Sequence, residues 1–152
     1  MPSPIDIRRL RSGDIPAMRA LNALFAVEFG DTDSYAAQPP ADTYLRKTLD
    51  KDHVIVLAAL EAGHVVGGLV AYELDKLERA RSEIYLYDLA VASSRRRRGI
   101  ATRLITALRA IARERDAWVV FVQADYGDDP AIALYQKLGI REEVLHFDLP
   151  IH

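Results

Sequence analysis

The sequence contains no cysteine among its 152 residues. This absence excludes disulfide bridges, thiolate zinc sites and cysteine nucleophiles. Long apolar runs are also missing, since none approaches the roughly 20 residues needed to cross a bilayer. The first residues carry prolines and charges in place of the apolar core of a secretory signal. We therefore expect a cytoplasmic protein without a membrane segment.

An excess of positive charge is missing as well. The formal net charge is −2, although residues 95–98 are four consecutive arginines. A nucleic-acid-binding domain is usually basic over a whole face, so the arginine run is a local feature and we expect no nucleic-acid partner. The four histidines show no metal-ligand spacing, and we expect no metal.

Hydrophobic periodicity predicts a chain of alternating strands and helices. Its length suits one domain, residues 1–152, with one core. Between residues 31 and 40 we expect a polar loop. The predicted strands cover residues 5–9, 54–60, 65–72, 84–91, 117–122 and 140–149, and the predicted helices cover 15–29, 41–50, 100–115 and 130–138.

The fold class follows from the order of these elements. The strand at 84–91, the helix after it and the strand at 117–122 form a βαβ unit, which implies a parallel pair with a right-handed crossover. We therefore predict an α/β (mixed α+β) fold with a central twisted mixed sheet flanked by helices. Gly67 and Gly68 lie inside a predicted strand, which indicates a bulge or a close backbone approach.

The four arginines and Gly99 lie between a buried strand and an amphipathic helix. A helix N-terminus presents unpaired N–H groups and the positive end of the helix dipole, and it therefore binds anions. Because Gly99 has no side chain, a phosphate can approach its backbone closely. We interpret the N–H groups of residues 96–101 as a pyrophosphate site. The alternative is a solvated basic turn.

Two motifs identify a family resemblance. Arg96-x-x-Gly99-x-Ala101 resembles the acetyl-CoA signature of the GNAT acetyltransferase superfamily, and residues 129–140 resemble the helix that follows it in that family. A closer resemblance is to the type I aminoglycoside 3-N-acetyltransferases. It rests on the segments 28–31, 81–91, 123–130 and 138–144.

The resemblance implies a GNAT-like fold, a homodimer and acetyl-CoA as co-substrate. It also implies acetylation of the 3-amino group of a gentamicin-like aminoglycoside, and hence antibiotic resistance. The residues that it implies for acetyl-CoA binding are Leu89, Ala90, Val91, Arg96, Arg97, Arg98, Gly99, Ile100, Ala101, Thr102 and Tyr135.

Asp88 is the first candidate for a general base, and Glu83 is the second. Strand alternation places Asp88 on one face with Ile84, Leu86 and Ala90, where a carboxylate is costly unless it is paired or functional. It could accept the proton of a substrate ammonium, or it could serve as a structural partner of a buried arginine or backbone donor.

Tyr135 has two interpretations. If Tyr135 is simply one of the apolar residues of its helix, it would face the core. The motif instead implies that it protonates the departing CoA thiolate. A backbone N–H of residues 89–91 would polarise the thioester carbonyl. Because the sequence offers no cysteine and no evident serine triad, we expect direct attack by the amine.

Acidic residues near the loops suit a polycationic acceptor, because carboxylates attract and steer cations. Several of them could instead be helix caps. Other acceptors, namely a polyamine, another small amine or a protein lysine, stay open, as does a CoA-binding module without catalysis. The candidate substrate contacts are Glu28, Asp31, Glu83, Asp88, Asp125, Tyr126 and Asp128.

Overall fold

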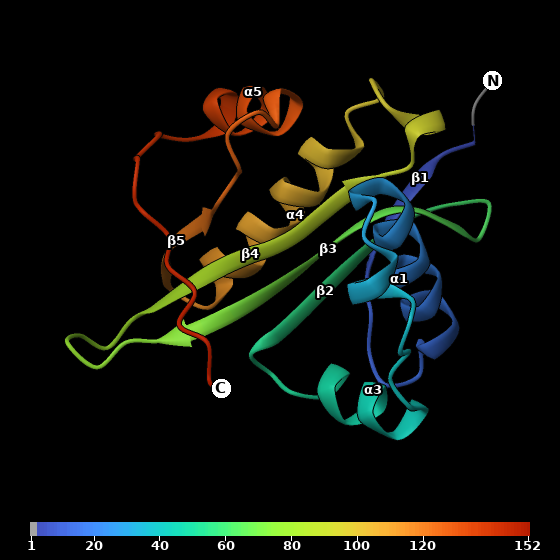
Figure 1. Cartoon of the computed structure of the whole chain (residues 1–152), viewed down its shortest axis with the longest axis horizontal. Helices are drawn as coiled ribbons and strands as arrows, with labels where there is room; N and C mark the ends of the chain where they lie inside the picture. Colours follow the sequence, from blue (N-terminus) through green and yellow to red (C-terminus); the bar gives the residue numbers. More distant parts are fainter. Residues whose placement is uncertain (1–2) are drawn as a thin grey trace.

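The computed structural model describes residues 3–152 and places five strands in one sheet, in the order β1-β2-β3-β4-β5. Neighbouring strands are antiparallel except β4 and β5, which are parallel (Figure 1). The predicted mixed sheet and its parallel pair are therefore confirmed. The strands are β1 (Ile5–Arg9), β2 (Val54–Glu61), β3 (His64–Asp75), β4 (Ser82–Val91) and β5 (Ala117–Val122).

The helices are α1 (Ile15–Phe29), α2 (Thr32–Tyr35), α3 (Asp42–Leu49), α4 (Ile100–Glu114) and α5 (Asp129–Leu138), with a 3-10 turn η1 (Ser93–Arg95). The predicted loop at residues 31–40 contains α2, because the Asp31 carboxylate accepts a hydrogen bond from the Ser34 N–H at 3.0 Å and caps this short helix. Among residues 3–152, no helix combines the length and hydrophobicity of a bilayer crossing.

The sheet separates two apolar layers. In Figure 1, α1 and α3 lie in front of the sheet and α4 lies behind it. Leu21 and Phe25 of α1 are fully buried against the front face, and Leu104 and Leu108 of α4 against the back face. A Cβ at Gly68 would lie 2.6 Å from a Leu21 methyl, so the predicted close backbone approach is where α1 packs on β3.

A β-bulge interrupts β4. Its pairing with β3 passes from Val70–Asp88 to Ala71–Leu86, which leaves Tyr87 as an extra residue. The extra residue inverts the alternation, so that Leu86 packs behind the sheet while Ala90 packs in front. The prediction that Asp88 shares a face with Ile84 and Leu86 is therefore wrong. Asp88 points to the front, where Tyr35 donates a hydrogen bond to it.

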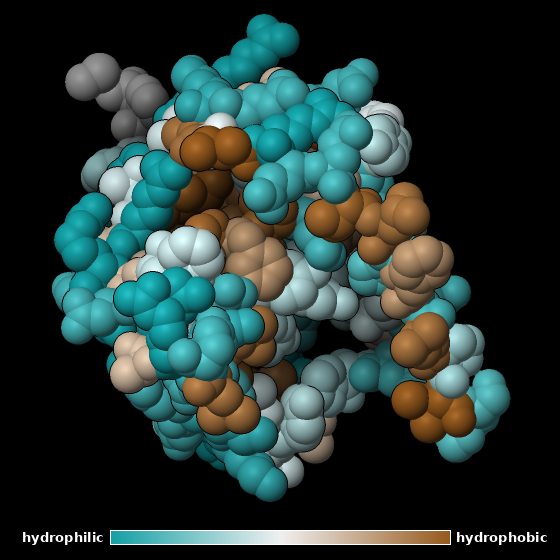
Figure 2. Space-filling view, turned by 90° about the vertical axis from the view of Figure 1, so that its left-hand side faces the viewer, coloured by the Kyte–Doolittle hydropathy of each residue, from teal (hydrophilic) through white to brown (hydrophobic). Residues whose placement is uncertain are grey.

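Residues 140–152 form neither a helix nor a strand, so the strand predicted at 140–149 is wrong. We call this segment the C-terminal arm. It runs from α5 across the front of the sheet in Figure 1, and in Figure 2 it stands off the right-hand side of the body with open space between. The alternation of apolar residues is present, but a strand also needs a neighbouring strand to pair with.

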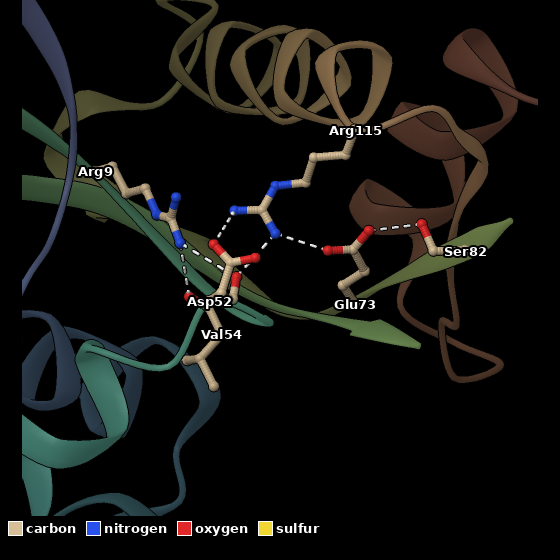
Figure 3. Close-up of polar contacts among 6 residues, drawn as sticks. All are labelled: Arg9, Asp52, Val54, Glu73, Ser82 and Arg115. Atoms are coloured by element: carbon tan, nitrogen blue, oxygen red, sulfur yellow. Dashed lines mark hydrogen bonds and ion pairs between the residues drawn. The ribbon is translucent and has the colours of Figure 1, made fainter. Parts of the chain in front are cut away.

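A polar cluster joins the sheet to the end of α4 (Figure 3). Arg115 donates hydrogen bonds to a Glu73 carboxylate oxygen at 2.7 Å and to the Asp52 carbonyl at 2.8 Å. Ser82 donates to the other Glu73 oxygen at 2.6 Å, and Arg9 donates to the Val54 carbonyl at 3.2 Å. The cluster therefore connects β1, β3, β4, α4 and the start of β2.

Replacing Glu73 by glutamine is expected to lower the free energy of unfolding by about 1–3 kcal/mol, because the largely buried Arg115 guanidinium then keeps only its longer ion pair with the exposed Asp52 carboxylate. Urea unfolding measures the loss. The matched control is Glu78→Gln, whose exposed pair with Arg81 should contribute under about 1 kcal/mol. Equal losses for the two variants would mean that the buried cluster does not stabilise the fold more than a surface pair.

Candidate functional site

The turn before α4 has an unusual backbone. Arg97 and Gly99 both adopt positive φ, at 64° and 72°, and Gly99 is the N-cap of α4. The first bond that closes the helix runs from the Arg103 N–H to the Gly99 carbonyl at 3.0 Å. The N–H groups of Ile100, Ala101 and Thr102 therefore have no partner within the helix. A Cβ at Gly99 would meet nothing within 4 Å, so the helix end lies open.

The arginine side chains of this turn bind carboxylates of the same chain. Arg95 and Arg98 donate to the two oxygens of Glu61 at 2.8 and 2.7 Å. Glu61 is only 8% exposed, and hydrogen bonds from Arg98 and Arg95 lower the pKa of its carboxyl. These two arginines therefore attach the turn to the end of β2.

A second carboxylate holds the other side of the turn. Glu28, near the end of α1, accepts hydrogen bonds from the Ser93 hydroxyl and from Arg96, each at 2.9 Å. Its side chain is 10% exposed. Glu28 thus lies against the turn itself, and α1 helps to fix the position of the helix end.

β4 and β5 separate beside this turn. Their parallel pairing ends at Leu86 and Val122, whereas β4 continues to Val91. The Ala92 N–H donates to the Val66 carbonyl of β3 at 2.8 Å. Since donors alternate along an antiparallel strand, the N–H groups of Leu89 and Val91 point away from β3, toward the gap that β5 leaves.

Tyr135 comes from α5 to the far side of this gap. A small cavity of about 70 Å³ is lined by Tyr135, by Leu86 of β4 and by Val120 and Val122 of β5. Burial, reinforced by the charge of Asp128, raises the pKa of the Tyr135 hydroxyl to about 12. The hydroxyl is therefore protonated at neutral pH and can donate a proton.

Asp88 lies directly after the bulge of β4. Tyr35 of α2 donates a hydrogen bond to its carboxylate at 2.6 Å. Burial raises the pKa of Asp88, and the bond from Tyr35 partly opposes that rise. The pKa of Tyr35 is raised by burial and by its bond to Asp88. The arrangement holds a half-buried carboxylate, a group with raised proton affinity, at the edge of the gap.

An aromatic surface extends from Asp88 along the front of the sheet. We use this name for Tyr72, Tyr85, Tyr87 and Phe121. Tyr87 contacts Tyr72 and Tyr85 with ring centroids 5.9 and 5.2 Å apart, and Tyr85 stacks on Phe121 at 4.7 Å. Such ring faces carry partial negative charge and attract cations.

The remaining predicted residues lie in other places. Glu83, near the start of β4, accepts a hydrogen bond from the Trp118 indole at 3.1 Å. Asp31 and Asp128 cap α2 and α5. The Asp125 carbonyl accepts a hydrogen bond from the Asp128 N–H before α5.

Tyr126 is 81% exposed and donates to Glu143 of the C-terminal arm at 3.2 Å. The structure thus brings the arginine turn, residues 89–91, Asp88 and Tyr135 around one gap. It sets Glu83 apart, near the opposite end of β4.

Two residues of the site were missed by the sequence analysis. Tyr35 belongs to a segment interpreted as a polar loop, and nothing local links it to a residue 53 positions later. Glu61 lies between the strands predicted at 54–60 and 65–72, and the structure places it at the end of β2. The sequence offers one signal for the pairing of Glu61 with the arginines. It is a carboxylate at the end of an apolar strand, in a chain that has a basic run elsewhere.

Comparison with known proteins relates the chain to acetyltransferases. A model of the acetyltransferase (GNAT) family matches residues 18–140. The chain is 25% identical over 113 residues to an uncharacterised N-acetyltransferase, YhfO, of Bacillus subtilis, across 73% of this chain and 76% of that protein.

Two crystal structures from uncultured soil metagenomic samples are similar over nearly the whole chain. One, an aminoglycoside acetyltransferase, is 52% identical with a TM-score of 0.96, covering 98% of this chain and 99% of that chain. Another aminoglycoside acetyltransferase, in complex with sisomicin, is 33% identical with a TM-score of 0.91, covering 97% of both chains.

Proposed function

Because the chain belongs to the acetyltransferase (GNAT) family, we propose that it transfers the acetyl group of acetyl-CoA to the 3-amino group of an aminoglycoside. The observation that carries the proposal is the position of Asp88. This carboxylate lies beside the gap between β4 and β5, at the end of an aromatic surface. The 52% identity to an aminoglycoside acetyltransferase supports the same acceptor class.

The donor would be bound mainly by backbone groups. The open N–H groups at the start of α4 suit a pyrophosphate, whereas Arg95, Arg96 and Arg98 are already paired with Glu61 and Glu28. The N–H groups of Leu89 and Val91 would then face the donor in the gap. They suit a thioester carbonyl, on which negative charge develops during acyl transfer.

Each proton in the reaction then has a group to accept or donate it. The attacking amine forms a bond to the acetyl carbon and gives up a proton to Asp88, directly or through a water. The carbon–sulfur bond breaks, and the departing thiolate takes a proton from Tyr135. The products are an N-acetylated amine and free CoA, and proton exchange with water returns Asp88 to its ionised form and Tyr135 to its protonated form. No acyl-enzyme is needed, in keeping with the cysteine-free sequence.

The acceptor side suits a multiply charged amine. Ammonium groups would pack on the aromatic surface and approach the carboxylates of Asp31 and Asp88. Glu83 lies five positions before Asp88, about 16 Å along an extended strand. It could contact a distant part of a large acceptor, but only Asp88 adjoins the gap, so we assign the general base to Asp88.

The proposal is tested by incubating the protein with acetyl-CoA and sisomicin. Mass spectrometry should detect a singly acetylated drug, and NMR should place the acetyl group on the 3-amino position. Spermidine and a lysine peptide serve as competing acceptors, with lower kcat/KM expected for both. Acetylation of another amine, no acetylated drug, or a higher kcat/KM for spermidine or the peptide would each refute the proposal.

Tyr35 is a positioning residue in this scheme, and Tyr35→Phe is expected to change the pH profile. Its hydroxyl stabilises ionised Asp88, so its loss should raise the pKa of that carboxyl further. A base is inactive when protonated. The acidic limb of kcat/KM should therefore move to higher pH by about one to two pH units, since hydrogen bonds to charged groups contribute about 1.5–3 kcal/mol.

Tyr44→Phe is the matched control for this shift, because Tyr44 lies exposed on α3. Its pH profile should coincide with that of the unmodified enzyme. An unchanged acidic limb in Tyr35→Phe would contradict the role assigned to this hydroxyl, even if the overall rate fell.

A further inference from the structure

The turn that precedes α4 depends on other elements for its shape. Its backbone enters the left-handed region at Arg97 and again at Gly99, with φ of 64° and 72°, and this region is unfavourable for a residue that carries a side chain. Within residues 3–152, the N–H groups of residues 97–99 donate no hydrogen bond to another backbone group. The backbone donors at the start of α4 are therefore held in place by contacts from outside the turn.

Glu61 makes the contact that spans the arginine run. One of its carboxylate oxygens accepts a hydrogen bond from Arg95 at 2.8 Å, and the other accepts one from Arg98 at 2.7 Å. Arg95 ends the 3-10 turn η1, and Arg98 directly precedes Gly99, the N-cap of α4. A single side chain thus fixes the two ends of the run relative to each other.

The backbone that carries Glu61 is held on both sides. Glu61 is the last residue of β2, and it pairs with Ile5 of β1 on one side and with His64 of β3 on the other. Its side chain is buried, so water competes little for the two oxygens. Glu61 therefore connects the turn to a fixed point of the sheet.

We propose that Glu61 is a positioning residue for the donor. By holding Arg95 and Arg98, it keeps the backbone N–H groups at the start of α4 in the arrangement that binds the pyrophosphate of acetyl-CoA. This inference rests on the proposed function, and it gives a carboxylate a favourable part in the binding of an anion. Glu61 acts through the turn, because both of its oxygens are already bound to guanidinium groups.

The charge of Glu61 by itself predicts the opposite effect. A carboxylate repels a pyrophosphate, and it also neutralises arginines that would otherwise attract one. If charge dominated, Glu61→Gln would release Arg95 and Arg98 and tighten the binding of CoA. If position dominates, the substitution lets the turn adopt other conformations, and the fraction of molecules ready to bind falls. The direction of the change in Kd decides between the two effects.

Calorimetric titration with CoA measures that direction. We expect the Kd of Glu61→Gln to be at least about fivefold higher than that of the unmodified protein, as for a turn that is correctly arranged about a fifth of the time. The matched control is Glu73→Gln, which removes the carboxylate of another buried arginine pair, near the other end of β3. Its Kd should stay within about twofold, because distant sites rarely couple.

A donor without phosphates tests whether Glu61 acts through the anion site. S-acetyl-pantetheine carries the thioester but no pyrophosphate. With sisomicin as acceptor, its kcat/KM should be the same for Glu61→Gln and the unmodified enzyme to within about twofold. The kcat/KM for acetyl-CoA should instead fall at least about fivefold through a higher KM. An equal loss with both donors would overturn the proposal, because it would mean that the substitution disturbs the whole gap.

Glu61→Asp provides a second variant that keeps the charge. The aspartate side chain is one methylene shorter and cannot hold both guanidinium groups, so its Kd for CoA should rise by at least about twofold, and this result decides the question if Glu61→Gln does not fold. An unchanged or lower Kd in either folded variant would overturn the inference and leave the proposed function standing. An unmodified protein that does not bind CoA would overturn both.

Discussion

Replacing Asp88 by asparagine is expected to lower kcat for acetyl transfer by roughly 10²–10⁴-fold, the usual contribution of a general base. Asparagine keeps the size of the side chain and can still accept the hydrogen bond from Tyr35, but it cannot take up a proton. Donor binding should stay within about twofold, because the groups proposed for CoA are backbone N–H groups on other residues. Steady-state kinetics and a CoA titration measure the two effects.

The same substitution should not destabilise the fold. Burial raises the pKa of Asp88 in the folded state, so the ionised carboxylate opposes folding at pH values above its unfolded pKa. That cost is absent at lower pH, where the group is protonated in both states. Thermal unfolding at pH 7 should therefore give an equal or higher Tm for Asp88→Asn.

Glu83→Gln is the matched control, because it changes the other candidate base on the same strand. Its kcat should fall by no more than a few-fold, since Glu83 adjoins Trp118 and lies far from the gap. If Glu83→Gln caused the larger loss, the assignment of the base to Asp88 would be wrong. If neither variant lost activity, neither Asp88 nor Glu83 would be the general base.

Gly99→Val is expected to weaken CoA binding at least about tenfold, which corresponds to 1.4 kcal/mol. Gly99 has a φ of 72°, a conformation that costs a side-chain-bearing residue roughly 1–2 kcal/mol. Valine would both strain the N-cap of α4 and occupy the space through which a phosphate approaches. Calorimetric titration with CoA measures the change in Kd.

Two control variants separate these causes. Gly63→Val introduces the same strain at a φ of 80° in the turn between β2 and β3, also with nothing within 4 Å of its Cβ, and should leave the Kd unchanged. Arg95→Ala should change the Kd by about threefold or less, because Glu61 keeps Arg98. A larger effect from Arg95 than from Gly99 would mean that side-chain charge dominates donor binding.

Much of the fold could be predicted because its signals are local. Strands β1 and β5 have the predicted bounds, and α1 covers the helix predicted over residues 15–29. Each of these elements depends on the spacing of apolar residues within a short stretch of sequence and on the residues of the adjacent turn. The strand–turn–helix that places Gly99 at the start of α4 has the same local basis.

The position of Asp88 could not be predicted in the same way. Its face depends on the bulge at Tyr87, which is a property of the pairing between β4 and β3. Strand alternation read along β4 alone gives the opposite face. The bond from Tyr35 likewise joins two segments that become neighbours only when α2 packs against the sheet.

In the arginine run, the contributions of the sequence and of the tertiary structure are easiest to tell apart. The sequence by itself determined that a basic turn with a flexible glycine precedes an amphipathic helix, because those properties belong to consecutive residues. Only the tertiary structure decided what the arginines do, since Glu61 and Glu28 reach them from β2 and α1. Pairing of charges distant in sequence depends on the assembled sheet and helices, and here it leaves the backbone N–H groups as the open donors of the turn.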